Sequence, residues 1–408
     1  MPMSTADAPS ANGGDIMKWT DSVFEPREPA GFMRLRNTIF RPCKAIPGLW
    51  IAWRRKFSYY SCEQNRRRTR TSTEEDPVKK LRLGIIGTGI AARELHLPAL
   101  RALKDRFEIV HVASRTPANA RRFARMAGGV PWTDDYRELL RNPAVEAVDI
   151  VAPISLNLPA TRAAVAAGKH VFVEKPLAGN LPDARRMCAL ARSARTVCYI
   201  AENYRHHPVY LRVRDLLRAG TIGRPYAWDW HAWYHMRNDD KYAKTRWRRH
   251  NRHIGGLVTD VGVHYIAALR MWFGELEPTA AWVRSVNPVI GDTDTFSMTA
   301  RAPRGVRGTF SIFFTACGCS DNALTVFGTK GTLSVVWDRI TVRIPGKKPR
   351  TVTVPDDGGF RGEFAEFHRA VTAGGKFINT FAEGYRDLET MLRALALAGR
   401  TAGARSGA

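Results

Sequence analysis

A lysine directly follows a short apolar run near the middle of the chain. Residues 171–173 are Val-Phe-Val, and Glu174, Lys175 and Pro176 come next. At the carboxyl end of a parallel strand, an ammonium group can hydrogen-bond a substrate oxygen and stabilise negative charge that develops on it. The alternative is a solvated lysine that only happens to follow a strand. The position therefore makes Lys175 a candidate for stabilising an alkoxide.

A carboxylate and an imidazole stand four residues apart further along the chain. Asp260 and His264 follow the pair Gly255-Gly256, at the start of a helix expected over 261–272. This spacing places both side chains on one face of the helix. A histidine beside a carboxylate is the usual pair for moving a proton near neutral pH. The alternative is an aspartate that caps the helix and a histidine packed in the core.

A glycine-rich loop lies between a short apolar strand and an amphipathic helix near residue 90. The first glycine of such a loop permits a tight turn, and the second lets the backbone approach a pyrophosphate. A small third residue allows close packing of the helix on the sheet, while the helix N-terminus offers free N–H groups to an anion. The loop therefore predicts a dinucleotide site, with the binding residues Gly87, Thr88, Gly89, Ile90 and Ala92.

The end of the second expected strand indicates which dinucleotide is bound. This strand ends in Ala113-Ser114-Arg115 rather than in an acidic residue. An acid there would accept a hydrogen bond from a ribose 2′-hydroxyl and repel a 2′-phosphate. A hydroxyl followed by a guanidinium favours the phosphate through charge-assisted hydrogen bonds. Ser114 and Arg115 therefore predict NADP in preference to NAD, unless Arg115 is only a solvated charge at a strand end.

These groups must be positioned by two different arrangements of strands and helices. Between residues 79 and 205, strands and helices alternate, which predicts a parallel sheet covered on both faces. Strands are expected at 81–86, 107–113, 148–151, 171–173 and 197–201, with helices at 95–103, 117–127, 158–167 and 181–193. Beyond residue 205, strands are expected at 226–235, 292–302, 305–315, 323–327, 332–336 and 340–344, with helices at 261–272, 360–373 and 382–402.

The predicted fold class is therefore α/β, in two domains. Residues 79–205 form a Rossmann dinucleotide-binding domain. Residues 206–408 form an α+β domain for substrate binding and oligomerisation, built on an open, mostly antiparallel sheet.

The chain is strongly basic. It has 63 Lys and Arg against 38 Asp and Glu in 408 residues, a net charge of +25. Such a surface attracts nucleic acid, acidic lipid or phosphorylated small molecules, although a soluble enzyme from a host with a basic proteome would look the same. Residues 1–78 are expected to be a disordered basic extension, ending near Arg66-Arg67-Arg68. The alternative is an arm that binds an anion or a partner subunit.

The cysteines and apolar segments bound the class of protein further. Six cysteines without a CxxC pair exclude a disulfide scaffold, predict no metal site and indicate the reducing cytoplasm. Arg54-Arg55-Lys56-Phe57 resembles a twin-arginine export signal, but no apolar segment follows it. Because no apolar run approaches about 20 residues, no membrane partner is expected.

Taken together, the glycine-rich loop, the Glu-Lys-Pro element and the Gly-Gly…Asp-x-Gly-x-His element resemble the Gfo/Idh/MocA family of oxidoreductases. That family includes glucose–fructose oxidoreductase and inositol dehydrogenase, and the resemblance covers residues 80 to about 400. It implies that Lys175, Asp260 and His264 form a catalytic triad and that Glu174 lies by the nicotinamide ribose. Asn157 stands where many members have a histidine near the same ribose.

The resemblance also has departures and further implications. Ala267 replaces a second aspartate that often follows the family's histidine, and the extension 1–78 has no counterpart in most members. Members often associate through the open sheet, so a homo-oligomer is expected.

The implied reaction is hydride transfer between a nicotinamide cofactor and a secondary alcohol or ketone of a sugar, polyol or sugar derivative. His264 is expected to take the hydroxyl proton, Lys175 to stabilise the alkoxide, and Asp260 to orient His264 or a neighbouring hydroxyl.

Two further segments are candidates for binding the substrate. Tyr204 and Arg205 end the last strand of the parallel sheet, and Trp247 and Arg248 precede the glycine pair. A Trp face suits a sugar ring, while the basic stretch 247–253 suits a phosphorylated or nucleotide-linked sugar.

Two other functions remain open. One is a dihydrodiol or biliverdin-type reductase on the same fold. The other is a non-catalytic dinucleotide sensor that contacts nucleic acid through its basic arm. Because RRM, KH and zinc-finger patterns are missing from the sequence, we expect no nucleic-acid partner.

Overall fold

The computed structural model describes residues 79–249 and 253–403. The prediction of a disordered extension over 1–78 lies outside the described residues.

The dinucleotide part is built on a six-stranded parallel sheet in the order β3-β2-β1-β4-β5-β6. Its strands are β1 (Leu81–Ile86), β2 (Phe107–Ala113), β3 (Trp132–Thr133), β4 (Ala147–Ile150), β5 (His170–Glu174) and β6 (Cys198–Ala201). Every pairing in this sheet is parallel. Strand β4, in the middle of the sheet, and β6, at its edge, are buried at every position, as expected for strands covered on both faces. This strand order is that of a Rossmann domain, with ligands expected at the carboxyl ends of the strands.

Helices cover both faces of the parallel sheet. They are η1 (Ala92–His96), α1 (Leu97–Ala102), α2 (Pro117–Met126), α3 (Tyr136–Arg141), η2 (Ile154–Leu156), α4 (Asn157–Ala166) and α5 (Leu181–Ser193). Helices α3, α4 and α5 share one hydrophobic cluster with the sheet, and α1 and α2 share the other. Helix α9 (Phe360–Thr372), from the C-terminal part of the chain, joins the second cluster through Phe364 and Phe367.

The second sheet has eight strands in the order β14-β13-β12-β11-β7-β10-β9-β8. They are β7 (Pro225–Trp233), β8 (Glu277–Arg284), β9 (Thr295–Arg301), β10 (Arg307–Phe313), β11 (Asp321–Gly328), β12 (Gly331–Val336), β13 (Arg339–Arg343) and β14 (Arg350–Thr353). Only β7 and β10 pair in parallel; the other pairings are antiparallel. The predicted fold class, a Rossmann domain followed by an α+β part on an open, mostly antiparallel sheet, is confirmed.

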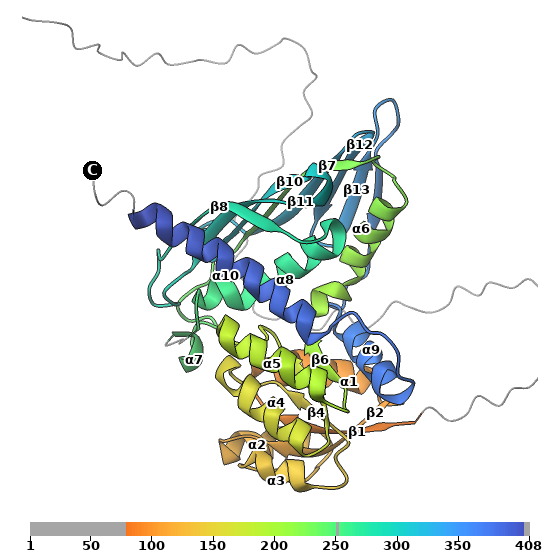
Figure 1. The fold of residues 1–408 in the computed structure, drawn as a ribbon, viewed down its shortest axis with the longest axis vertical. Helices are drawn as coiled ribbons and strands as arrows, with labels where there is room; N and C mark the ends of the chain where they lie inside the picture. Colours follow the sequence, from red (N-terminus) through yellow and green to blue (C-terminus); the bar gives the residue numbers. More distant parts are fainter. Residues whose placement is uncertain (1–78, 250–252, 404–408) are drawn as a thin grey trace, which may run out of the picture. The chain divides into compact units, whose positions relative to one another are not determined.

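Three long helices pack near one face of this sheet. Helix α8 (Gly256–Phe273) packs on α10 (Phe381–Gly403) and on α6 (Pro208–Arg218). Figure 1 shows α10, in blue, running from β8 past α8 to α5 of the parallel-sheet part. The remaining short elements are η3 (Asn203–Arg205), α7 (Arg246–Arg249) and η4 (Pro303–Gly305).

Glycine is required where α8 begins. Gly255 has a φ of 79°, and a Cβ placed there would lie 2.2 Å from Thr259 Oγ1 and 2.3 Å from Leu395 Cδ1. The glycine pair therefore lets the chain turn into α8 while it packs against α10. Helix α8 begins at Gly256 rather than at the expected residue 261.

Some elements lacked a signal in the sequence. No strand was expected at β8, where the inward positions carry Pro278 and Ala281 rather than large apolar side chains. The two-residue strand β3 and the short helix α3 were missed for a similar reason, because such short elements show no periodicity.

Among residues 79–249 and 253–403, no helix is long and apolar enough to cross a membrane, and no group of three or more His, Cys, Asp and Glu side chains is arranged to hold a metal ion.

Candidate active site

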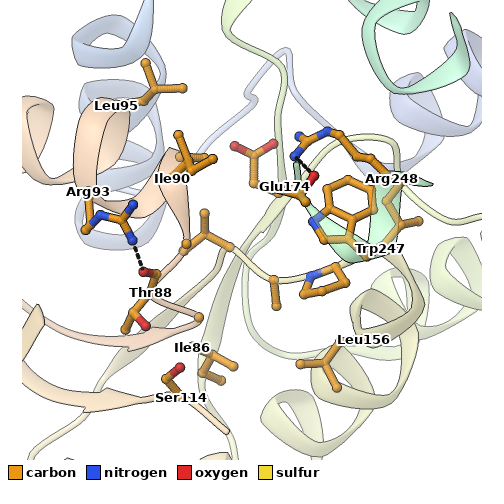
Figure 2. Close-up of a pocket in the computed structure, with 18 of the residues that line it drawn as sticks. Ile86, Thr88, Ile90, Arg93, Leu95, Ser114, Leu156, Glu174, Trp247 and Arg248 are labelled. Atoms are coloured by element: carbon orange, nitrogen blue, oxygen red, sulfur yellow. Dashed lines mark hydrogen bonds between the residues drawn. The ribbon is translucent and has the colours of Figure 1, made fainter. Parts of the chain in front are cut away.

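A cavity of about 1020 Å³ opens where the parallel strands end, and both parts of the chain line it (Figure 2). Most of the residues predicted to act there line it. From the parallel-sheet part these are Gly87, Thr88, Gly89, Ile90, Ser114, Arg115, Glu174, Lys175 and Tyr204; from the second part they are Trp247, Arg248, Asp260 and His264.

The glycine-rich loop forms one wall of the cavity. Gly87 has a φ of 105°, and a Cβ there would lie 2.3 Å from the carbonyl oxygen of Val151. At Gly89 an added Cβ would meet no protein atom within 4 Å, so the free space there faces the cavity rather than packed protein. This space, at the start of a helix, fits a pyrophosphate that approaches the backbone. Ala92 does not line the cavity; it is fully buried and packs against the sheet.

The loop after β2 forms the far end of the same cavity. Ser114 and Arg115 line it together with Thr116, and Arg115 is exposed. Ser114 is held in place because its N–H donates to the carbonyl oxygen of Thr133 at 3.1 Å. Figure 2 shows Ser114 below the glycine-rich loop and Thr88. A guanidinium and two hydroxyls are thus available where the second ribose of a dinucleotide would lie.

Lys175 and Asp260 meet across the two parts of the chain. The Lys175 ammonium donates to the Asp260 carbonyl oxygen at 2.7 Å and to its carboxylate Oδ1 at 3.0 Å. The other carboxylate oxygen accepts from Arg248 Nε at 3.0 Å. Burial alone would raise the pKa of Asp260, but Lys175 and Arg248 outweigh it and lower that pKa far below its usual value. Asp260 is therefore a buried carboxylate that fixes two cations.

His264 contacts the carboxylate of Glu202 rather than that of Asp260. Its Nδ1 lies 2.7 Å from Oε1 of Glu202, and the ring of Tyr204 stacks on the imidazole at 4.7 Å between centroids. The expectation that Asp260 orients His264 is wrong, because both Asp260 oxygens engage cations. Sequence reasoning missed Glu202, although the signal was there: an acid directly follows β6, as Glu174 closes β5.

A second histidine lies buried behind Glu174. His96 Nδ1 is 2.8 Å from Asp149 Oδ2, and its Nε2 is 2.9 Å from Glu174 Oε1. Burial lowers the pKa of His96, but the two carboxylates outweigh it and raise that pKa well above its usual value. The imidazole therefore carries both hydrogens and donates to both acids. It links the helix after the glycine-rich loop to Glu174, and periodicity could not show this contact.

Besides Ala92, two more predicted ligand residues do not line the cavity. Asn157 is 1% exposed and donates from Nδ2 to the carbonyl oxygens of Glu174 and Pro176, both at 2.9 Å. It therefore fixes the backbone around Lys175 and does not line the cavity. Arg205 is 4% exposed and donates from Nη2 to both carboxylate oxygens of Asp387 at 2.8 Å. It is a buried ion-pair partner of α10, and the expectation that it contacts substrate is wrong.

The segment before α8 forms another wall of the cavity. Trp247 and Arg248 both line it, and the Arg248 guanidinium lies 4.1 Å from the centre of the Trp247 ring. His253 instead contacts the carbonyl oxygen of Gly256 through Nε2 at 3.0 Å. Residues 250–252 of the predicted basic stretch lie outside the described residues.

Comparison with known proteins places this site in a family. Residues 81–202 match the "Oxidoreductase family, NAD-binding Rossmann fold" and residues 210–334 match the "GFO/IDH/MocA C-terminal domain". The chain is 31% identical to an uncharacterised protein of Saccharomyces cerevisiae, YMR315W, over 72% of this chain and 88% of that protein. It is 30% identical to 1,5-anhydro-D-fructose reductase of Ensifer adhaerens, over 76% of this chain and 94% of the relative.

A solved structure supports the same assignment. An oxidoreductase from Thermotoga maritima aligns with a TM-score of 0.75 and 36% identity, covering 79% of this chain and 97% of that one. The chain matches family models for both domains, and its alignments cover most of the length of named reductases and oxidoreductases. It is therefore an enzyme rather than a sensor. It belongs to the Gfo/Idh/MocA family of NAD(P)-dependent oxidoreductases.

Proposed function

We propose that this enzyme transfers hydride between NADP and a secondary alcohol or ketone of a sugar, polyol or sugar derivative. The observation that carries the proposal is that one cavity is lined by the dinucleotide loop, Lys175 and His264. These are the groups that binding a dinucleotide, stabilising an alkoxide and moving a hydroxyl proton require.

In the proposed mechanism, a bound nicotinamide supplies or accepts the hydride. Glu174 and the glycine-rich loop would hold the cofactor. In the oxidation direction, His264 takes the hydroxyl proton at Nε2 while Lys175 donates a hydrogen bond to the developing alkoxide. Asp260 keeps the Lys175 ammonium at the edge of the cavity, since the two groups are 3.0 Å apart. Reduction follows the same steps in reverse.

The substrate proposed here is an uncharged sugar ring or carbon chain that bears hydroxyl groups. Lys175 and Arg248 both engage Asp260, so much of their charge is already balanced within the site. The Trp247 face and Tyr242 line the same side of the cavity and suit the apolar face of a sugar ring. Phosphorylated and nucleotide-linked sugars are the alternative favoured by the basic stretch 247–253.

A substrate screen tests this proposal directly. NADP reduction and NADPH oxidation are measured with polyols, sugars, sugar phosphates, nucleotide-linked sugars, dihydrodiols and biliverdin. We expect the highest kcat/KM with a neutral sugar or polyol. Turnover of dihydrodiols or biliverdin alone would replace the proposal with the reductase alternative, and no turnover in any class would refute it.

The cofactor preference rests on Ser114 and Arg115. Charge-assisted hydrogen bonds to a 2′-phosphate are worth about 1.5–3 kcal/mol each, or roughly ten- to a hundredfold in affinity. We expect Arg115→Glu to weaken NADPH binding by at least tenfold and to change NADH binding little, as measured by fluorescence titration. Arg121→Glu makes the same charge change on α2, outside the cavity, and serves as the control. Equal effects of the two substitutions would show that Arg115 acts only through net charge.

We also propose that the enzyme self-associates through the second sheet, on the face turned away from α8. The ring centroids of exposed Trp282 and Phe313 are 5.7 Å apart, and Phe313 stacks on Trp233. Val336, on the same sheet, is 40% exposed. An apolar patch of this kind supports an interface between copies. We expect Trp282→Arg to lower the mass measured by light scattering, while Ile378→Arg, at an exposed apolar position outside the sheet, leaves it unchanged. A monomeric wild type would refute this proposal.

A further inference from the structure

Glu202 occupies a rigid, buried position directly after β6, the edge strand of the parallel sheet. Glu202 is 1% exposed. Its carboxylate Oε1 accepts from the N–H of Tyr204 at 3.1 Å, and its carbonyl oxygen accepts from Asn379 Nδ2 at 3.0 Å. The backbone and the side chain are thus both fixed, so this carboxylate cannot easily follow a moving partner.

The imidazole of His264 is held on two sides from this segment. Glu202 Oε1 lies 2.7 Å from Nδ1, and the Tyr204 ring covers one face with an interplanar angle of 21°. Because the two ring nitrogens point in different directions, contact at Nδ1 leaves Nε2 for a ligand in the cavity that His264 lines.

The charge of Glu202 settles which nitrogen carries the hydrogen. Burial alone would raise the pKa of Glu202, but His264, Arg205 and Lys175 outweigh it and keep that pKa below its usual value. The side chain is therefore an ionised carboxylate near neutral pH, and an ionised carboxylate only accepts hydrogen bonds. Nδ1 of His264 must then donate, and in a neutral imidazole this leaves the lone pair on Nε2.

We propose that Glu202 is a positioning residue for catalysis: it fixes His264 in the Nδ1–H form with Nε2 as the base, and it balances the imidazolium that forms during alcohol oxidation. This inference rests on the proposed function of His264. Neither the spacing of the sequence motifs nor the family resemblance indicated such a role.

In the proposed oxidation step, the substrate O–H bond breaks and its proton forms a bond to Nε2 of His264. The electron pair of that bond becomes the second bond of the carbonyl group. The hydrogen on the carbon would leave with its own electron pair to an oxidised nicotinamide, the cofactor that the proposed function supplies. His264 gains one positive charge at that moment, beside the negative charge of Glu202.

Other acids near the site are committed to different partners. Asp260, four residues away on α8, engages Lys175 and Arg248 through its two oxygens. Glu174 accepts from His96 and from the N–H of Lys175. Glu202 and Tyr204, after β6, contact His264, and Glu174, at the end of β5, interacts with it electrostatically.

The kinetic test compares three variants of the full-length enzyme. Glu202→Gln keeps the shape but loses the charge, and its amide N–H₂ can donate to Nδ1 and move the imidazole hydrogen to Nε2. Glu202→Asp retains a carboxylate. Glu366→Gln is the control, because Glu366 is another largely buried acid, which accepts from Tyr199 and lies outside the cavity.

We expect Glu202→Gln to lower kcat by about a hundredfold with little change in cofactor affinity. Glu202→Asp should recover at least tenfold of the lost kcat, and Glu366→Gln should stay within threefold of wild type. An unchanged kcat in Glu202→Gln would overturn the proposal, as would equal losses in Glu366→Gln.

A second measurement does not depend on turnover. In wild type labelled with ¹⁵N-histidine, and assigned by comparison with His264→Gln, the ¹⁵N shifts report which nitrogen of His264 carries the hydrogen. We expect the Nδ1–H form in wild type and a change of form in Glu202→Gln. The Nε2–H form in wild type would overturn this inference. An Nδ1–H form in an enzyme that turns over no alcohol would refute the proposed function alone.

Discussion

Replacing Lys175 with methionine removes the ammonium from the cavity and keeps the length of the side chain. An ammonium has three N–H donors, and Asp260 takes two of those of Lys175, at 2.7 and 3.0 Å. One donor therefore remains for the substrate oxygen. Loss of one charged donor to a developing oxyanion costs about 2.7–4 kcal/mol, or roughly a hundred- to a thousandfold in kcat. We expect a loss of this size at saturating cofactor and substrate, with cofactor affinity nearly unchanged.

Lys169 provides the matched control for this experiment. It precedes β5, whereas Lys175 follows it, and its ammonium donates to the carbonyl oxygens of Asn142 and Val145 at 3.1 and 2.7 Å. Lys169→Met should therefore keep kcat within threefold of wild type. A Lys175→Met enzyme that also stays within threefold would refute the reasoning, because the ammonium would then have no part in the rate-limiting chemistry.

Two further predictions concern buried charge. Arg205→Met breaks a buried ion pair with Asp387, so we expect the free energy of unfolding in urea to fall by about 3 kcal/mol while KM is unchanged. A tenfold rise in KM at unchanged stability would show instead that Arg205 contacts the substrate. Glu363 is fully buried, both carboxylate oxygens are buried without a hydrogen-bond partner among the described residues, and burial raises its pKa well above 4.5. Folding therefore retains a proton that the unfolded chain releases above about pH 4.5, and wild-type stability falls by about 1.4 kcal/mol per pH unit until the raised pKa is reached. Glu363→Gln removes this penalty, so its stability gain over wild type should grow from pH 5 to pH 8, and a gain independent of pH would contradict the argument.

The parts of the site that depend on local spacing could be predicted from the sequence. The glycine-rich loop, Lys175 at a strand end and His264 on a helix each carry a local pattern, and the parallel strand ends bring them together. Alternating strands and helices were sufficient for most of the Rossmann part, because its longer elements show their period, whereas the short β3 and α3 do not.

The partners of these groups could not be predicted, because they come from distant segments. Glu202 and His264 are separated by 62 residues, and His96 and Glu174 by 78. Arg205 ends a strand region as a substrate-binding residue would, yet α10 supplies Asp387 and turns it into a buried ion pair. Which carboxylate a cation meets depends on packing of the whole chain, and no local spacing contains that information.

The most direct measurement is a crystal structure of the ternary complex with oxidised cofactor and the best alcohol substrate from the screen. We expect one substrate oxygen within roughly 3.2 Å of both Lys175 Nζ and His264 Nε2. Its carbon should lie about 3–3.5 Å from the nicotinamide C4. A reacting hydroxyl that contacts neither group, with its carbon at that distance from C4, would contradict the central claim.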